Sequence, residues 1–304
     1  MSRWNSRSFW KLIALTFTLA LLVACGGDEE PTPAPTSAAV IAPTATAIPA
    51  EPTATPIPAQ TVAPAAEALA LDSVTVAVNA EFKPFVFLDE NGAVTGFDID
   101  LMNALAQVGG FELQYTDMPF EALLDSVTVG EYDVAISAIT ITDERSQRVD
   151  FTAPYFEAGQ APVSYLNAGQ GLAVRLDNTT VFSLNDLTEA NVVGVKQSTT
   201  GDSFVSETAA ATVTRFAEAP EALQALSSGA VDAVVLDIPV IVDYIKTHPE
   251  AGIKLVGGPV TDEKYGIVVS KAKPEVLAAL DSGLEQVRAD GTYDALFNQW
   301  FGSP

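Results

Sequence analysis

The sequence predicts an α/β fold built from two lobes of similar construction. Apolar strand patterns alternate with helical patterns from Asp72 onward. In addition, a helix, a Gly-x-x-Asp turn, an apolar strand and a polar residue follow one another twice, at Gly130–Ser137 and at Gly229–Asp237. A chain of 304 residues has room for two such lobes once its non-globular start is discounted.

The N-terminus has the features of a bacterial lipoprotein signal. Three basic residues precede an apolar run, Leu12–Ala24, that is too short for an ordinary membrane span. The run ends at Cys25, the only cysteine, in a sequence that resembles a lipobox. We therefore expect a signal peptide at residues 1–24, a lipid on Cys25 and no internal disulfide. The alternative is a plain secretory signal with an incidental cysteine.

Residues 25–70 are rich in Pro, Thr and Ala and contain no aromatic residue. Such a segment cannot bury a core and samples polyproline II. We expect a flexible linker that lifts a domain off a membrane; a disordered tail is the alternative.

The formal net charge of −24 indicates which partners to exclude. A chain this acidic repels phosphate backbones, so we expect no nucleic-acid partner.

The elements of the first half follow from apolar spacing and turn residues. Asp89–Gly92 is a turn signal, Asp98 is a candidate N-cap, and Gly109–Gly110 ends the helix that follows it. We expect strands at Val74–Val78, Phe85–Leu88, Phe111–Tyr115 and Val134–Ile136, and helices at Ile99–Ala106 and from Phe120 to near Gly130.

The second half repeats this order. A strand at Val192–Val195 leads through the polar stretch Lys196–Asp202 into a helix, and Pro220 suits the first turn of the next helix. The strand Tyr265–Val269 is predicted to return to the first lobe. The remaining elements are a strand at Ala233–Leu236 and helices at Pro220–Leu226, Pro274–Val287 and Gly291–Phe301.

Polar residues stand at the ends of four predicted strands: Asn79, Ser137–Arg145, Lys196–Thr200 and Asp237. Ligands of open α/β sheets bind beyond the carboxyl ends of the strands, so a cleft between the lobes would unite these residues. The Arg145 guanidinium offers two parallel donors to a carboxylate. Alternatively, Arg145 is a surface residue paired with Asp143 or Glu144.

Five motifs in order resemble the family 3 solute-binding proteins of bacterial amino-acid ABC transporters. They are Gly96–Asp100, Ser137–Arg145, Asp150–Tyr155, Asp232–Asp237 and Gly291–Phe301. The resemblance implies the type II periplasmic binding protein fold, in which two Rossmann-like lobes joined by two crossover strands enclose a ligand cleft. It places the crossovers near Ala158–Ser164 and Thr261–Tyr265, the first lobe at 71–160 and 264–304, and the second at 161–263.

The resemblance also implies roles for single residues. Arg145, assisted by Thr140, would clamp the α-carboxylate of an L-amino acid, and Thr199 with the following N–H group of Thr200 would add donors from a helix start. Asp237 would receive the α-ammonium, with the carbonyl or hydroxyl around Ser137–Ala138 as a second acceptor. Phe82 and Phe120 would flank the ligand.

Two positions depart from the family pattern. Asn79 stands where some members, notably glutamine binders, have an acid. Lys196 stands where many members have a neutral side chain, although some carry Lys. An amide and an ammonium suit a polar neutral or acidic ligand better than a basic one, which favours an amino acid such as glutamine. Lys196 has two alternatives, to point at solvent or to pair with an acid.

We expect an extracytoplasmic, lipid-anchored monomer that delivers its ligand to an ABC permease by hinge closure, with no catalytic residue, cofactor or metal. The alternative is a periplasmic enzyme resembling a cyclohexadienyl or arogenate dehydratase. That enzyme needs a general acid in the cleft, and the sequence offers no acid besides Asp237. His248 is expected on the surface at a helix end.

Overall fold

The computed structural model describes residues 71–157 and 168–302, which belong to one compact unit of the chain. The predictions for residues 1–24, residues 25–70, Cys25 and a first crossover near Ala158–Ser164 concern residues outside these ranges. Within the two ranges, no helix is both long and apolar enough to cross a membrane.

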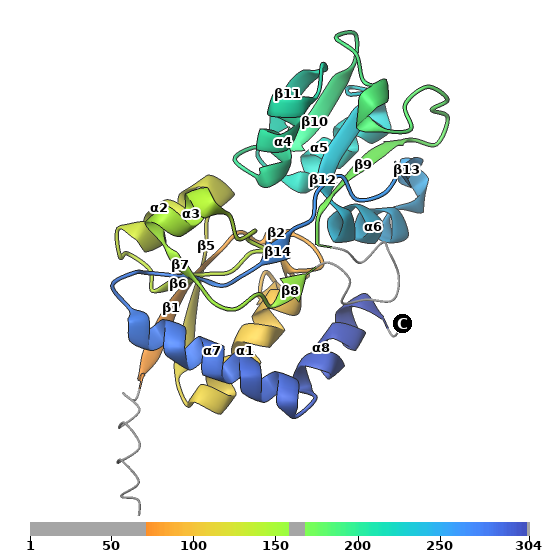
Figure 1. Cartoon of the computed structure of the whole chain (residues 1–304). Coiled ribbons are helices and arrows are strands. Elements are labelled where there is room, and N and C mark those ends of the chain that lie inside the picture. Colours follow the sequence, from red (N-terminus) through yellow and green to blue (C-terminus); the bar gives the residue numbers. More distant parts are fainter. Residues whose placement is uncertain (1–70, 158–167, 303–304) are drawn as a thin grey trace, which may run out of the picture. The chain divides into compact units, whose positions relative to one another are not determined.

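The first sheet has five strands in the order β5-β1-β6-β15-β7. Figure 1 labels β1, β5, β6 and β7 of this sheet. β1 runs parallel to β5 and β6, whereas β15 runs antiparallel to both β6 and β7. The bounds are Ser73–Val78 for β1, Glu112–Asp117 for β5, Val134–Ala135 for β6, Asp150–Phe151 for β7 and Val268–Val269 for β15. The position of β15 confirms the predicted return of the chain to the first lobe.

Helices cover both faces of this sheet because successive residues of a strand point to opposite sides. Val76 and Val78 of β1 belong to the apolar cluster of α1 and α7, whereas Ala77 belongs to that of α2. The helices are α1 at Phe97–Gly109, α2 at Phe120–Thr128, α3 at Asp143–Arg148, α7 at Pro274–Ala289 and α8 at Thr292–Phe301. A small antiparallel sheet precedes α1, with β2 at Glu81–Phe82, β3 at Val86–Leu88 and β4 at Val94–Thr95.

The second sheet repeats this construction in the order β11-β10-β12-β9-β13. β10 is parallel to β11 and β12, and β9 is antiparallel to both of its neighbours. The same alternation of strand directions in both sheets agrees with the pattern that the sequence shows twice. The bounds are Gln170–Arg175 for β9, Val192–Lys196 for β10, Thr212–Phe216 for β11, Ala233–Asp237 for β12 and Ile253–Val256 for β13.

The second sheet is also covered on both faces. Val193 and Val195 pack in the cluster that includes Val205 of α4. Val234 and Leu236 pack on the other face in the large cluster that contains Val76 and Val78 and that also includes residues of α5 and α6. The helices are α4 at Thr200–Thr208, α5 at Ala219–Ser228 and α6 at Ile238–Thr247, with short 3₁₀ turns η1 at Leu184–Asp186 and η2 at Pro249–Ala251. We call the parts built on the first and second sheets the first and second lobes.

A two-stranded antiparallel sheet stands where the chain passes between the lobes. It pairs β8, Phe156–Glu157, with β14, Lys264–Tyr265. In chain order β8 precedes β9 of the second sheet, and β14 lies between β13 of the second sheet and β15 of the first. The second crossover, predicted near Thr261–Tyr265, therefore contains β14.

The prediction that Asp98 caps α1 is wrong. The helix begins two residues earlier than predicted, at Phe97, and its N-cap is Gly96. Gly96 has φ 129° and ψ 175°, a conformation that only glycine adopts readily. This turn buries the Asp98 side chain completely, and its Oδ2 accepts the N–H of Ala138 at 2.8 Å.

The stretch around Arg145, Asp143–Arg148, forms the helix α3, which the sequence does not predict. Thr142 is the N-cap of α3, and its Oγ1 accepts the N–H of Arg145 at 3.1 Å. Six polar residues with no buried member give no apolar period, so only the Thr cap signals this helix.

We predict that Gly96→Ala destabilises the fold far more than Gly92→Ala. A Cβ on Gly96 would lie 2.1 Å from the carbonyl oxygen of Phe85, whereas a Cβ on Gly92 (φ 78°) meets nothing within 4 Å. Urea unfolding should show a loss of about 3 kcal/mol for Gly96→Ala and about 1 kcal/mol for Gly92→Ala. Equal losses would contradict the close approach of Gly96 to Phe85.

Candidate functional site

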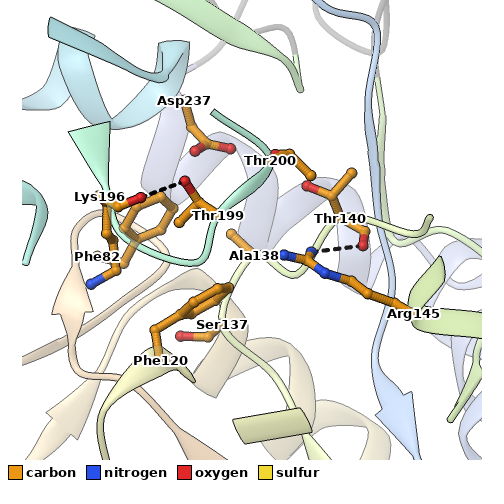
Figure 2. Close-up of a pocket in the computed structure, with 10 residues that line it drawn as sticks. All are labelled: Phe82, Phe120, Ser137, Ala138, Thr140, Arg145, Lys196, Thr199, Thr200 and Asp237. Atoms are coloured by element: carbon orange, nitrogen blue, oxygen red, sulfur yellow. Dashed lines mark hydrogen bonds between the residues drawn. The ribbon is translucent and has the colours of Figure 1, made fainter. Parts of the chain in front are cut away.

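A narrow cavity of about 10 Å³, with room for about one water molecule, lies where the ends of strands from both lobes meet. Its lining residues are Phe82, Phe120, Ser137, Ala138, Thr140, Arg145, Lys196, Thr199, Thr200 and Asp237 (Figure 2). All ten were selected from the sequence. The eleventh candidate, Asn79, lies behind Lys196 and does not line the cavity.

Arg145 enters the cavity from α3 and is held by backbone oxygens of both lobes. Its Nη1 donates to the carbonyl of Thr140 at 2.9 Å, and its Nη2 donates to the carbonyl of Ser198 at 3.5 Å. Burial lowers the pKa of its guanidinium. Among the described residues no carboxylate lies within 4.0 Å of it, so it pairs with neither Asp143 nor Glu144. The alternative of a paired surface arginine is therefore wrong.

Asp237 faces the cavity from the second lobe, at the last position of β12. Its side chain is buried and accepts a hydrogen bond from the hydroxyl of Tyr265 in β14. Burial and, to a smaller extent, the negative charge of Glu263 raise the pKa of Asp237 to about 7. No lysine, arginine or histidine of the described ranges forms an ion pair with it.

Glu263 is a second acid beside the cavity, and the sequence analysis missed it. It is 5% exposed, and its Oε2 accepts the hydroxyls of Thr140 at 2.7 Å and Thr200 at 3.1 Å. Its Oε1 accepts the hydroxyl of Thr261 at 3.0 Å. No local pattern marks Glu263, because it follows no predicted strand and only the fold of the crossover brings it near Asp237.

Lys196 is fully buried. Of the two alternatives for its side chain, solvent exposure or pairing with an acid, the structure has the pair. Its Nζ forms an ion pair with Glu218 and donates to Asn79 Oδ1 at 2.9 Å and to the carbonyl of Ala217 at 3.0 Å. Asn79 belongs to the first lobe, so this network crosses between the lobes. Glu218 was not predicted; it precedes α5, where its side chain also takes part in a capping box.

The N-terminus of α4 starts at the cavity, as predicted. Thr199 is the N-cap, and its hydroxyl accepts the N–H of Asp202 at 3.2 Å and donates to the carbonyl of Lys196 at 2.8 Å (Figure 2). Thr200 is the first helical residue, and its hydroxyl donates to Glu263. Both hydroxyls are thus engaged within the protein, which leaves the N–H groups of the first turn as donors toward the cavity.

Ser137 and Ala138 form a rigid wall of the cavity. The Ser137 hydroxyl donates to the carbonyl of Asn79 at 3.1 Å and accepts its N–H at 3.2 Å. Ala138 has φ 48°, a left-handed conformation that is rare for alanine. The carboxylate of Asp98 compensates for this strain by accepting the Ala138 N–H. Burial raises the pKa of Asp98 to about 7.

A wider groove adjoins the cavity and shares Phe120, Arg145, Thr199 and Thr200 with it. It is lined by residues of α2 and α3 on one side and of α4 on the other. The groove offers a small molecule a path to the cavity.

The chemistry available at the cavity is recognition of opposite charges. Arg145 and Asp237 face one space from two lobes, and each lacks an ion-pair partner among the described residues. His248 lies exposed at the end of α6, as expected. In the described part of the chain, no group of three or more His, Cys, Asp or Glu residues could hold a metal ion.

The model of one protein family, "Bacterial extracellular solute-binding proteins, family 3", matches residues 74–303. The "Probable histidine-binding protein" of Neisseria gonorrhoeae is 39% identical over 230 residues, which cover 74% of this chain and 82% of that protein.

Two solved structures are also similar. One is of "An ancestral arginine-binding protein bound to glutamine", with a TM-score of 0.70, 40% identity and coverage of 76% of this chain and 98% of that chain. The other is of "the ancestral amino acid-binding protein AncCDT-1, a precursor of cyclohexadienyl dehydratase", with a TM-score of 0.68, 34% identity and coverage of 75% and 95%. The predicted fold of two Rossmann-like lobes, that of the type II periplasmic binding proteins, is confirmed.

We predict that Asp98→Asn flattens the pH dependence of stability. An aspartate in the unfolded chain loses its proton near pH 4, whereas Asp98 in the folded chain keeps its proton to about pH 7. Between these values the folded state binds the extra proton, so the free energy of unfolding falls as pH rises and levels off above pH 7. The raised pKa of Asp237 also makes the free energy of unfolding fall as pH rises. Because Asp237 remains in the variant, part of the slope should remain as well.

Urea unfolding at several pH values from 4.5 to 8 measures this effect. Asp98→Asn should reduce the slope below pH 7, and the exposed control Asp125→Asn should leave it unchanged. An unaltered slope in Asp98→Asn would show that Asp98 is ionised in the folded protein throughout this range.

Proposed function

The chain belongs to family 3 of the bacterial extracellular solute-binding proteins, and from this premise we propose that it captures an L-amino acid for an ABC permease. The proposal specifies the ligand's charged groups, the movement that traps it and the anchoring of the protein.

The unpaired charges of the cavity carry this proposal. Arg145 and Asp237 lie on opposite lobes, and neither has an ion-pair partner in the described part of the chain. Buried charges without partners are costly, so the site favours a ligand that supplies both counter-charges. The zwitterionic head of an amino acid does so, with its α-carboxylate on Arg145 and its α-ammonium on Asp237. The N–H groups at the start of α4 add donors, and the carbonyls around Ser137–Ala138 add acceptors.

The proposed side chain is polar and uncharged, as in glutamine. Beyond the two charges, the cavity is flanked by Phe82 and Phe120, which exclude water. Lys196 closes the far end together with Asn79, which lies behind it. The named relatives include binders of histidine, arginine and glutamine, so the identity of the side chain has to come from this chain's own residues.

Binding is proposed to act through hinge closure about the crossover that contains β8 and β14. A ligand held by both lobes binds the closed state better than the open one and so shifts the population toward it. Micromolar affinity, about −8 kcal/mol, is ample for a gap of a few kcal/mol between the states. The lobes proposed for this movement are residues 71–160 with 264–304, and residues 161–263.

The remainder of the chain fits an extracytoplasmic protein held at a membrane. A signal peptide at residues 1–24, a lipid on Cys25 and a linker at residues 25–70 would tether the lobes within reach of the permease. We propose a monomer that uses no cofactor.

One observation favours the enzyme alternative. Asp237 has a pKa of about 7 and would suit a general acid, and one structural neighbour is described as a precursor of cyclohexadienyl dehydratase. That neighbour is itself described as an amino acid-binding protein. Formation of product from prephenate or arogenate by the purified protein would favour the enzyme over the binding protein.

We predict that one or a few of the twenty L-amino acids raise the melting temperature of the protein, and that Arg145→Ala abolishes this shift. In this variant the site loses the two guanidinium donors to the α-carboxylate, and amino-acid binding should weaken at least 100-fold. The matched control is Arg148→Ala, in the same helix, because Arg148 is exposed and pairs with Asp125. No shift with any of the twenty would overturn the proposed function.

We also predict that affinity rises with pH up to about pH 7. The ammonium requires an ionised Asp237, but the free protein holds a proton there below about pH 7. Binding then releases this proton, so the dissociation constant should fall by up to about tenfold per pH unit between pH 5 and pH 7. Calorimetry of wild type and Asp237→Asn measures this: the variant should bind weakly and without this dependence. A constant wild-type affinity from pH 5 to pH 8 would show that Asp237 does not titrate on binding.

A further inference from the structure

The environment of the Lys196 ammonium is that of a binding site for a basic group. It is fully buried against the carboxylate of Glu218, the amide oxygen of Asn79 and the carbonyl of Ala217. Its Nζ also lies 6.0 Å from the ring centroid of Phe82 and 5.8 Å from that of Phe120. An acid, two neutral oxygens and two aromatic faces are the groups that recognise a guanidinium or ammonium.

The protein fills this position with its own cation. An ammonium has three N–H donors, and the three oxygen partners of Lys196 use all of them. Figure 2 shows the Nζ pointing away from Arg145 and Asp237, the charges proposed to hold the amino-acid head group. A ligand held by these charges would extend its side chain toward Phe82, Phe120 and Lys196, which line the same cavity.

We propose that Lys196 is a built-in substitute for a basic ligand side chain and restricts the protein to amino acids with neutral side chains. This inference rests on the proposed function, because it presupposes an amino acid held by Arg145 and Asp237. The ammonium of Lys196 repels a second cation, and its ion pair removes the carboxylate of Glu218 that the second cation would need. A neutral amide meets no such repulsion.

The network also joins the lobes. Asn79 of the first lobe contacts Lys196 and, through its Nδ2, Glu218 at 3.4 Å in the second lobe. Lys196 thus makes its contact with Asn79 only when the lobes meet. The ion pair with Glu218 lies within the second lobe and persists when the lobes separate.

The test is the ratio of affinities for glutamine and arginine, measured by calorimetry. Wild type should bind glutamine, or another neutral amino acid, at least 100-fold more tightly than arginine or lysine. Lys196→Ala removes the internal cation and leaves Glu218, Asn79 and the two rings, so this variant should bind arginine or lysine at least tenfold more tightly than wild type does.

Two further variants make the result specific. Adding Glu218→Gln to Lys196→Ala removes the acid and should cancel the gain for basic amino acids. Lys271→Ala is the matched control, because Lys271 is an exposed lysine that pairs with Asp150 outside the cavity, and it should leave the ratio unchanged.

The outcomes are separable. If wild type binds arginine as tightly as its best neutral ligand, the inference is overturned, and this result does not depend on the folding of any variant. A Lys196→Ala protein that folds, by circular dichroism, but gains no affinity for basic amino acids also overturns it. If wild type binds no amino acid at all, the proposed function fails instead.

Discussion

The proposed binding of a ligand depends on two opposite charges, Arg145 and Asp237, that face one cavity and have no ion-pair partner in the described part of the chain. Arg145 and Asp237 come from different lobes, and each is kept in place by neutral groups alone: carbonyls of Thr140 and Ser198 for the arginine, and the hydroxyl of Tyr265 for the aspartate. Neutral partners fix the geometry but supply no ion pair at close range; the negative charges of Glu263 and Asp237 act on Arg145 from farther away. The free energy of the ligand-free closed state is thereby raised, and a zwitterion that satisfies both groups lowers it. In the proposed function, ligand capture and closure of the lobes then have the same cause, which is the pairing of both charges with the zwitterion.

The crossover connects this charge balance to the hinge. Tyr265 belongs to β14, and Glu263 precedes that strand directly. Glu263 accepts hydroxyls from Thr140 of the first lobe and Thr200 of the second, and Tyr265 donates to Asp237. The residues that surround the proposed head group therefore include the segment about which the lobes would turn. Any change in the charge of Asp237 acts on its hydrogen bond with Tyr265, which belongs to the proposed hinge.

The sequence predicted the fold and most of the cavity because both follow from local patterns. Apolar runs buried on two faces mark the strands, and the carboxyl ends of parallel strands meet at one edge, which is why Ser137, Lys196 and Asp237 could be selected together. What it missed depends on tertiary contacts. The cap at Gly96 requires the neighbouring carbonyl of Phe85, and the acids Glu263 and Glu218 reach the site only through the folded crossover and the start of α5. The charge of Lys196 was visible, but its neutralisation by Glu218 was not.

The central claim is that Arg145 holds the α-carboxylate of an amino acid whose ammonium lies on Asp237. A calorimetric cycle tests it most directly, by combining wild type and Arg145→Ala with the preferred amino acid and with its α-carboxamide. If the guanidinium and the carboxylate contact each other, removing either one costs nearly as much as removing both, and the coupling energy should be about 2 kcal/mol or more. Independent, additive losses would show that the carboxylate binds elsewhere and would contradict the account.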